Sequence, residues 1–214
     1  MNSIMLSGTL PNVFLGRTGI QSDIWRQQVT FEKGKTYLIE AASGTGKSSL
    51  LSFIIGYRHD FDGRILFDGT DIRRFGTAEW TNLRQEHVSI LFQELRLFPE
   101  LTAMENVEIK NSLTRFKERK EIERWFEALG IGDKKHSPVR QMSFGQQQRV
   151  AMIRALVQPF DFLLADEPIS HLDEANSQVM ASIMMEEARR QGAGIVVTSI
   201  GKHMDLPCDK TFRL

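Results

Sequence analysis

The sequence contains one cysteine, no excess charge of either sign and no long apolar run. The single cysteine, Cys208, cannot form an internal disulfide and has no neighbours at metal-ligand spacing, so a reducing, cytoplasmic compartment fits. The 27 basic and 27 acidic residues cancel, which disfavours nucleic acid as a partner. No stretch approaches the roughly 18 apolar residues that span a bilayer, and residues 1–10 lack the pattern of a signal peptide. We therefore do not expect this chain to cross a membrane by itself.

The chain has 214 residues, of which 41% are hydrophobic and 25% charged, enough for one compact domain. Apolar runs of strand length alternate with longer helical patterns, which predicts an α/β fold with a mostly parallel core sheet. The turn residues Asp68 and Gly69, together with the apolar run 29–31, predict an antiparallel β portion near the N-terminus. The other expected strands lie at 36–40, 64–67, 88–92, 160–165 and 195–198.

The pattern changes between residues 93 and 143, where helices are expected at 103–111 and 116–129 with no strand between them. The second of these carries its apolar residues on one helical face, namely Phe116, Ile122, Trp125, Phe126 and Leu129. We therefore expect one domain, 1–214, in which a helical subdomain at about 93–143 is inserted into a core of residues 1–92 and 144–214.

A long helix is expected at 174–191, where Asp173 is a suitable N-cap and Gly192 a suitable terminator. Met180, Met184 and Met185 within it are interpreted as core-filling residues.

A glycine-rich stretch lies between the apolar strand at 36–40 and an apolar helical pattern. Strand, glycine turn and helix is the context of a phosphate-binding loop, in which backbone N–H groups point at a phosphate chain. Lys47 would supply positive charge to the β- and γ-phosphates, and the Ser48 hydroxyl could ligate Mg²⁺. The residues expected to contact the nucleotide are Ala41, Ala42, Ser43, Gly44, Thr45, Gly46, Lys47, Ser48 and Ser49.

Two further features follow this loop along the chain. The first is the stretch Met142-Ser143-Phe144-Gly145-Gln146-Gln147-Gln148-Arg149, and the second is an apolar run that ends in Asp166-Glu167. In this order, the three features resemble the ATP-binding cassette (ABC) family, the nucleotide-driven engines of membrane transporters. The resemblance extends from about Lys35 to Ser199, which is most of the chain.

The resemblance implies a P-loop NTPase that uses ATP and Mg²⁺. Asp166 would hold the Mg²⁺ ion through water, and Glu167 would orient the water that attacks the γ-phosphate. Gln93, after the apolar run 88–92, is similar to the glutamine of the family that reaches Mg²⁺ and the attacking water. The metal-binding set is then Ser48, Gln93 and Asp166, and the catalytic set is Glu167, Gln93 and Ser199.

The resemblance also implies a head-to-tail pair of cassettes, either a homodimer or a pair with a similar subunit, that encloses two ATP molecules. The helix that begins at Ser143 would point its N-terminus at the nucleotide bound by the other subunit. The residues implied in this contact are Ser143, Phe144, Gly145, Gln146 and Asp173.

The chain departs from the family pattern at three motif positions. Ala41 and Phe144 each stand where the family has glycine, so Ala41 loses backbone freedom and Phe144 adds bulk near a phosphate. Ser199 stands where the family has histidine, and serine cannot carry the positive charge of an imidazolium. We therefore expect slow hydrolysis, and His203 could substitute only if the backbone is displaced.

A fourth departure concerns the aromatic residue on which the family stacks adenine. Phe14 is the best candidate and Trp25 the second, although residues 11–28 match the family poorly. Selectivity for the base should be correspondingly loose.

The expected function is that of an ATP-binding, ATP-hydrolysing subunit of an ABC-type transport complex. It would work on separate membrane-spanning permease subunits, docked at the inner membrane face through the groove between its two subdomains. The subclass it resembles serves lipoprotein release, macrolide export or cell division. An alternative is a slow or non-hydrolysing ATP-dependent dimerisation switch in a membrane or cell-division complex. A small-molecule P-loop kinase is opposed by the stretch at 142–149.

Overall fold

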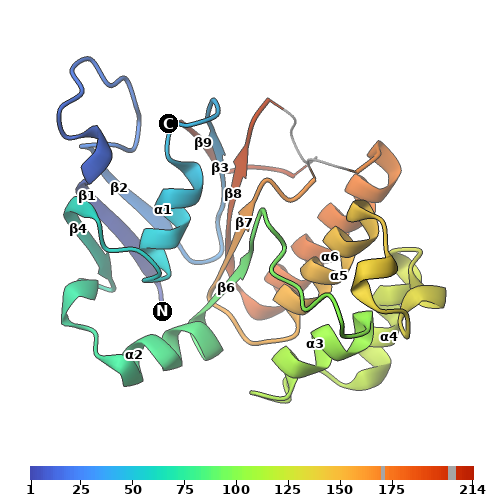
Figure 1. The fold of residues 1–214 in the computed structure, drawn as a ribbon. Helices are drawn as coiled ribbons and strands as arrows, with labels where there is room; N and C mark the ends of the chain where they lie inside the picture. Colours follow the sequence, from blue (N-terminus) through green and yellow to red (C-terminus); the bar gives the residue numbers. More distant parts are fainter. Residues whose placement is uncertain (170–171, 202–205) are drawn as a thin grey trace.

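The computed structural model describes residues 1–169, 172–201 and 206–214 and contains two β-sheets (Figure 1). One sheet is antiparallel, with the strand order β2-β1-β4-β5, and the other is parallel, with the order β6-β7-β8-β3-β9. The antiparallel strands are β1 (Ser3–Pro11), β2 (Gln28–Glu32), β4 (Phe61–Phe67) and β5 (Thr70–Asp71). The parallel strands are β3 (Thr36–Glu40), β6 (Val88–Leu91), β7 (Phe162–Asp166), β8 (Gly194–Ser199) and β9 (Lys210–Arg213). The predicted fold class, including the N-terminal antiparallel portion, is confirmed.

The helices are longest in the second half of the chain. They are α1 (Lys47–Ile54), α2 (Thr77–Asn82), α3 (Ala103–Asn111), α4 (Arg119–Ala128), α5 (Phe144–Leu156) and α6 (Glu174–Gln191). A π-helical turn, Leu83–His87, continues α2, and short 3₁₀ turns lie at Asn12–Phe14, Ile72–Arg74, Gly132–Lys134 and Val139–Gln141. Among the described residues, no helix is both long enough and apolar enough to cross a membrane.

The parallel sheet is buried on both faces because alternate residues of its strands enter two different cores. In β7, Phe162 and Leu164 pack with α1 and the antiparallel sheet, whereas Leu163 and Ala165 pack with α3, α5 and α6. Figure 1 shows the corresponding layers, with α1 between the two sheets and α3 to α6 together on the other side. A continuously apolar strand such as β7 is the sequence pattern that this burial requires.

The helical segment lies in one continuous hydrophobic cluster with α5 and α6. Met104 and Val107 of α3 and Phe126 of α4 belong to the same cluster as Val150 of α5 and Met184 of α6. The helix predicted at 103–111 is confirmed, and Thr102 caps it by a reciprocal capping box with Glu105. The helical subdomain boundary at 93–143 stays a prediction.

The helix predicted at 116–129 begins later, at Arg119, so Phe116 is not part of it. Ile122 and Phe126 are buried as expected, but Phe116 is partly exposed. The reason is Lys117, whose ammonium group lies 2.6 Å from Glu187 of α6 and 2.8 Å from Glu121. This buried cation holds the chain against α6 before α4 starts.

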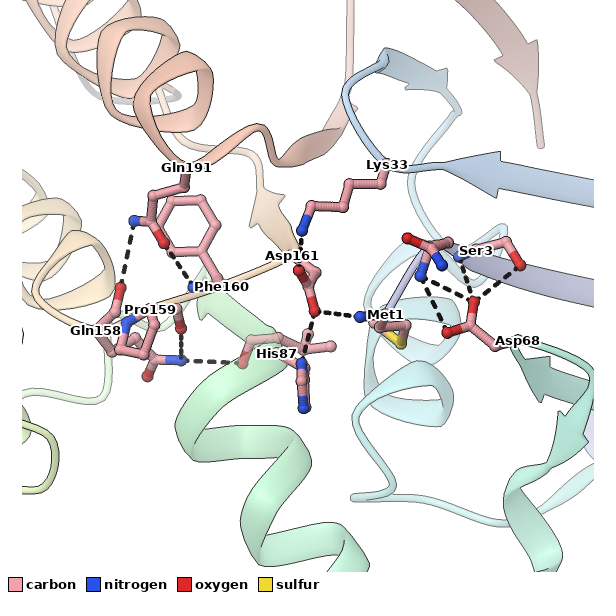
Figure 2. Close-up of polar contacts among 12 residues, drawn as sticks. Met1, Ser3, Lys33, Asp68, His87, Gln158, Pro159, Phe160, Asp161 and Gln191 are labelled. Carbon is pink, nitrogen blue, oxygen red and sulfur yellow. Dashed lines mark hydrogen bonds and ion pairs between the residues drawn. The ribbon is translucent and has the colours of Figure 1, made fainter.

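Asp161, immediately before β7, joins the two sheets on the side away from the carboxyl ends of the parallel strands (Figure 2). Its Oδ2 atom lies 2.6 Å from the Met1 amine and 2.6 Å from His87 Nδ1, and its Oδ1 atom pairs with Lys33. Burial opposes ionisation of Asp161, but the hydrogen bonds from Lys33, Met1 and His87 outweigh it. The pKa of Asp161 therefore lies below its ordinary value.

Candidate functional site

The predicted phosphate-loop, metal-binding and catalytic residues lie at the carboxyl ends of four parallel strands. β3 leads into the glycine-rich loop, β6 into Gln93 and β7 into Glu167, while β8 ends at Ser199. The strand register places Glu40 beside Ser199 and Asp166 beside Thr198. In an open α/β sheet, this edge is where ligands bind.

The glycine-rich loop has the backbone shape of a phosphate cradle. Gly44 and Gly46 have positive φ angles of 78° and 101°, and Gly46 directly precedes α1. A side chain at Gly46 would come within 3.0 Å of the Trp25 ring and 3.3 Å of the Phe14 ring. Trp25 also stabilises the loop directly, because its Nε1 atom donates a hydrogen bond to the Thr45 carbonyl at 3.0 Å. Glycine is therefore required at position 46 by both conformation and space.

Ala41 has no positive φ angle, so the alanine in place of glycine carries no backbone strain. Its N–H donates to the Ser199 carbonyl at 3.1 Å, as an ordinary continuation of the sheet. This departure from the family pattern is compatible with the loop geometry.

Lys47, the first residue of α1, has a nearly enclosed side chain, with 5% of its side-chain surface exposed. Its Nζ atom lies 3.1 Å from the Ala42 carbonyl, 3.4 Å from the Ala41 carbonyl and 3.5 Å from Glu167 Oε1. These contacts are long for charge-assisted hydrogen bonds, which are usually about 2.7–2.9 Å. The ammonium group is thus held in the pocket by partners that phosphate oxygens could replace.

Gln93 connects the loop to Glu167. Its Nε2 atom lies 3.4 Å from Glu167 Oε2, and its Oε1 atom lies 3.5 Å from the Ser48 hydroxyl. The Glu167 backbone has a positive φ angle of 49°, and its N–H donates to Thr198 at 3.2 Å. A tight turn after β7 therefore aims this carboxylate into the pocket, rather than letting it continue along the strand.

Asp166 is buried, and its Oδ1 atom accepts a hydrogen bond of 2.6 Å from the Thr198 hydroxyl. Ser48, Gln93 and Asp166 offer a hydroxyl, an amide oxygen and a carboxylate, the hard oxygen ligands that Mg²⁺ prefers. The three oxygen donors therefore fit Mg²⁺ by their chemistry. Among the described residues, no cluster of three or more His, Cys, Asp or Glu side chains offers another metal site.

Lys47, Ser48, Gln93 and Glu167 line one pocket of about 380 Å³, whereas Asp166 is not among its lining residues. The lining also includes Phe14, Arg58 and the loop residues Gly44 and Gly46. Such a volume and chemistry suit a nucleotide whose phosphates lie on the glycine-rich loop.

Ser199 does not line this pocket; it is the last residue of β8 and only 4% exposed, and its neighbour Ile200 forms the wall. Phe14 lines the pocket and is 7% exposed, whereas Trp25 is buried beneath Gly46. His203, the suggested substitute for histidine, lies outside the described residues.

Ser143 caps α5, as the sequence predicted. Its hydroxyl accepts from the Gln146 N–H at 3.3 Å, and Gln146 Oε1 accepts from the Ser143 N–H at 2.9 Å. Phe144 and Gly145 form the first turn, and the Phe144 side chain is 44% exposed. The bulky residue is therefore largely exposed at the N-terminus of α5, the helix end for which the resemblance implies a contact between subunits.

Asp173 caps α6, accepting from the Asn176 N–H at 2.8 Å. Arg149 of α5 donates to Asn176 Oδ1 at 2.5 Å and to the Leu129 carbonyl at 3.0 Å. The starts of α5 and α6 are thereby joined. Ser170 and His171, which precede Asp173 in its motif, lie outside the described residues.

Two residues at this site were not predicted from the sequence. Gln148 donates from Nε2 to the Pro168 carbonyl at 2.6 Å and lies 3.4 Å from the Glu167 carbonyl. Thr198 holds both Asp166 and the Glu167 N–H. In the sequence, Gln148 is the last of three consecutive glutamines, and its burial in α5 is what sets it apart from the other two. The sequence alone therefore did not mark it as a site residue.

The fold, the glycine-rich loop and the acid at the end of β7 define a P-loop nucleotide-binding ATPase. The sequence model described as ABC transporter matches residues 26–170. The ABC transporter ATP-binding protein YclH of Bacillus subtilis (strain 168) is 34% identical over 190 residues, covering 87% of this chain and 83% of YclH. The macrolide export ATP-binding/permease protein MacB of Pasteurella multocida (strain Pm70) is 37% identical over 180 residues, covering 80% of this chain and 27% of MacB.

A solved structure described as the dimeric structure of MJ0796, a bacterial ABC transporter cassette, matches with a TM-score of 0.78 and 25% identity. The match covers 92% of this chain and 87% of that one. A second structure of MJ0796, in a post-hydrolysis state with ADP and Pi, gives a TM-score of 0.75. The chain belongs to the ABC transporter family, and its predicted function as an ATP-binding, ATP-hydrolysing cassette subunit is confirmed at that level.

Proposed function

We propose that two copies of this chain enclose two ATP molecules and that their closure drives membrane-spanning permease subunits on separate chains. In each site, Lys47 and the loop glycines would bind the phosphates, and the Ser143-capped end of the opposite α5 would cover them. The observation that carries this proposal is the grouping of Lys47, Gln93 and Glu167 around one pocket. The dimeric structure of the MJ0796 cassette supports the pairing.

Hydrolysis would depend on exchange of the Lys47 contacts. When phosphate oxygens replace the carbonyl and carboxylate partners of Lys47, the Glu167 carboxylate is left beside Gln93, where it can accept a proton from an attacking water. Ser48 and Gln93, with Asp166 acting through water, would hold Mg²⁺, which neutralises phosphate charge when bound. Thr198 would keep Asp166 and the turn at Glu167 in place.

Ser199 would make this hydrolysis slow. It is buried at the end of β8 and has no positive charge to offer the transition state. Turnover would still occur through Glu167, so the cassette would work as a slow ATPase rather than as a non-hydrolysing switch. A slow or non-hydrolysing ATP-dependent dimerisation switch remains the second candidate function. Ser199 is the observation that favours it, whereas the similarity to transporter ATP-binding proteins favours a transport ATPase.

The permease would dock at a cationic cleft between the core and the helical segment. Tyr57 and Phe92 stack there, with ring centroids 5.8 Å apart, and Arg96 lies over the Phe92 ring at 4.0 Å. The adjoining pocket, of about 90 Å³, is lined by Arg84, Lys110 and Arg154 among others.

The charges of this cleft favour an acidic partner. Within the described parts of the chain, no carboxylate pairs with Arg84, Lys110 or Arg154, whose donors reach backbone carbonyls instead. Burial lowers the pKa of Lys110, and the nearby Arg154 lowers it further. Burial also lowers the pKa of Arg154 to about 10. An acidic side chain from a permease segment would relieve this repulsion, and docking there would attach the cassette to the inner membrane face.

Complementation between inactive variants tests the shared site. Lys47→Ala removes the phosphate-binding cation, and Ser143→Arg blocks the covering helix, so each variant alone should lose ATP hydrolysis. A mixture should regain part of the activity, because a mixed dimer contains one site with both residues intact. Mixtures that stay inactive, although both variants fold and exchange subunits, would contradict a site shared between protomers.

Co-purification from membranes tests the docking cleft. Lys110→Glu should lose the integral membrane partner while keeping ATP-dependent dimerisation. Lys120→Glu is the matched control, because Lys120 is exposed on α4 away from the cleft. If Lys110→Glu retains the partner as well as Lys120→Glu does, the cleft is not the docking site.

A further inference from the structure

Phe14 offers little surface on which a nucleotide base could stack. The residue is only 7% exposed, and a Cβ atom placed on Gly46 would lie 3.3 Å from Phe14 Cε2, so the phosphate loop lies against one edge of the ring. The guanidinium carbon of Arg17 lies 4.4 Å from the centre of the same ring. The aromatic residue that the sequence suggested for adenine is therefore already covered by an arginine.

Arg17 is exposed and lines the same pocket as Phe14. A turn holds it in place, because the Arg17 N–H donates to the Phe14 carbonyl at 3.0 Å. Among the described residues, no carboxylate forms an ion pair with Arg17. Arg58, which lines the same pocket, differs in this respect, since it pairs with Asp60 and donates to the Ser49 hydroxyl at 2.9 Å. Of these two arginines, Arg17 is thus the one whose guanidinium is not held by a carboxylate and is presented to a ligand in this pocket.

We propose that Arg17, supported by Phe14, covers the base of the bound nucleotide. A guanidinium group is planar and weakly hydrated, and it stacks on the face of an aromatic ring. One face of the group would lie on Phe14 and the other on the base, so that the three planes form one stack. This inference rests on nucleotide binding at the Lys47 loop and identifies the residue that contacts the base there.

The chemistry of this stack predicts loose selectivity between purine nucleoside triphosphates. Stacking on a cation depends on the π-face that every base has and not on the exocyclic groups that distinguish adenine from guanine. ATP and GTP should therefore bind with similar affinity, within about threefold of each other.

Binding titrations with non-hydrolysable analogues of ATP and GTP, and with inorganic tripolyphosphate, test the assignment. Arg17→Ala should weaken both nucleotide analogues on the order of tenfold and leave tripolyphosphate binding nearly unchanged, because only the base loses its contact. Arg17→Lys, which keeps the charge without the plane, should resemble Arg17→Ala for the nucleotides. Arg74→Ala, an exposed arginine of the 3₁₀ turn Ile72–Arg74, is the matched control and should bind all three ligands as the unaltered chain does.

Four outcomes decide the question. Nucleotide affinity that is unchanged or tighter in Arg17→Ala, together with a loss in Phe14→Leu, would show that the base stacks directly on Phe14 and would overturn the proposal. Equal weakening of tripolyphosphate and nucleotides would assign Arg17 to the phosphates and would also overturn it. Strong discrimination against GTP by the unaltered chain would contradict a base contact made by stacking alone. If Lys47→Ala binds as tightly as the unaltered chain, nucleotide binding at this loop fails, and the role of Arg17 fails with it.

Discussion

The ammonium group of Lys47 lies 3.5 Å from the carboxylate of Glu167, inside a pocket that nearly encloses both side chains. The contact joins the cation that would bind phosphate to the acid that would activate water. Because the Lys47 ammonium group cannot pair fully with phosphate oxygens and with the Glu167 carboxylate at once, binding of a triphosphate should weaken the ion pair between Lys47 and Glu167. Nucleotide binding would then prepare the acid for its role in hydrolysis.

Replacing Glu167 with glutamine should separate binding from hydrolysis. The neutral amide cannot accept the proton of the attacking water, so we expect the rate of phosphate release to fall by about 10²–10⁴-fold. Affinity for ATP should be kept or increased, since a negative charge beside the phosphates is removed. Phosphate release and the fraction of ATP-bound dimer in size-exclusion chromatography measure the two effects.

Glu86→Gln, at an exposed position of the π-helical turn, is the control for the loss of one carboxylate. If Glu167→Gln hydrolysed ATP as fast as this control does, Glu167 would not be the catalytic base.

Introducing histidine at position 199 tests the origin of slow turnover. An imidazolium at the end of β8 could stabilise negative charge that serine cannot, so Ser199→His should raise the hydrolysis rate on the order of tenfold. Because Ser199 is buried, thermal unfolding should be measured in parallel, to separate a loss of folded protein from a change in rate. An unchanged rate in a fully folded variant would remove Ser199 as the cause of slow hydrolysis.

Arg154 should hold the loop that follows Gln93 in its observed conformation. It donates to the Leu95 carbonyl and, at 2.5 Å, to the Arg96 carbonyl, and both of these residues have positive φ angles, of 58° and 50°. Non-glycine residues in that region cost roughly 1–2 kcal/mol each, so the arginine and the buried Leu95 side chain must offset the strain. Arg154→Met should therefore loosen residues 93–98, slow hydrolysis and leave ATP affinity unchanged.

Hydrogen exchange of the amides at 93–98 measures this loosening directly. Arg154→Lys is the informative companion variant, because a lysine keeps the charge but cannot donate to both carbonyls through one planar group. If both variants exchanged as slowly as the unaltered chain, the loop would be held by other contacts.

Asp161 should make folding stability depend on pH in the acid range. Its pKa is lower in the folded chain than the 3.8 of an ordinary aspartate, so its contribution is present above about pH 4 and is lost as the pH falls through the folded-state pKa. Asp161→Asn should reduce the free energy of unfolding by about 2 kcal/mol at pH 7 and flatten the acid limb of the stability curve. Urea unfolding between pH 3 and pH 7 tests the sign, and a variant whose acid limb stays as steep would contradict it.

The parts of this fold that the sequence predicts well are those in which a local pattern coincides with burial. The strand at 36–40 and the helices at 103–111 and 174–191 have the bounds expected from apolar periodicity and capping residues. In contrast, β1 was not predicted, because the alternation of Ile4 and Leu6 is interrupted at Gly8 by a shift in strand register. The short strand β9 and helix α2 carry too few apolar residues to give a periodic signal.

The site shows the same division. Lys47, Gln93, Asp166 and Glu167 stand where the chain leaves a buried strand or enters a helix, so their convergence follows from topology alone. The contacts of Arg17, Gln148 and Arg154 depend on which segments the finished fold brings together. No spacing in the sequence encodes them, and only the three-dimensional structure could bring them to light.

In the proposed pair of cassettes, the side chain of Gln148 would link the two nucleotide sites. Gln148 lies on α5 and donates a hydrogen bond to the carbonyl of Pro168, the residue that follows Glu167 in the same copy. The N-terminus of the same helix would contact the ATP bound by the other copy. A change in one nucleotide would thus reach Glu167 of the other site, the residue that would activate the water that attacks the second nucleotide. The two turnovers would be linked in time, and one amide group would set how strongly the first event influences the second.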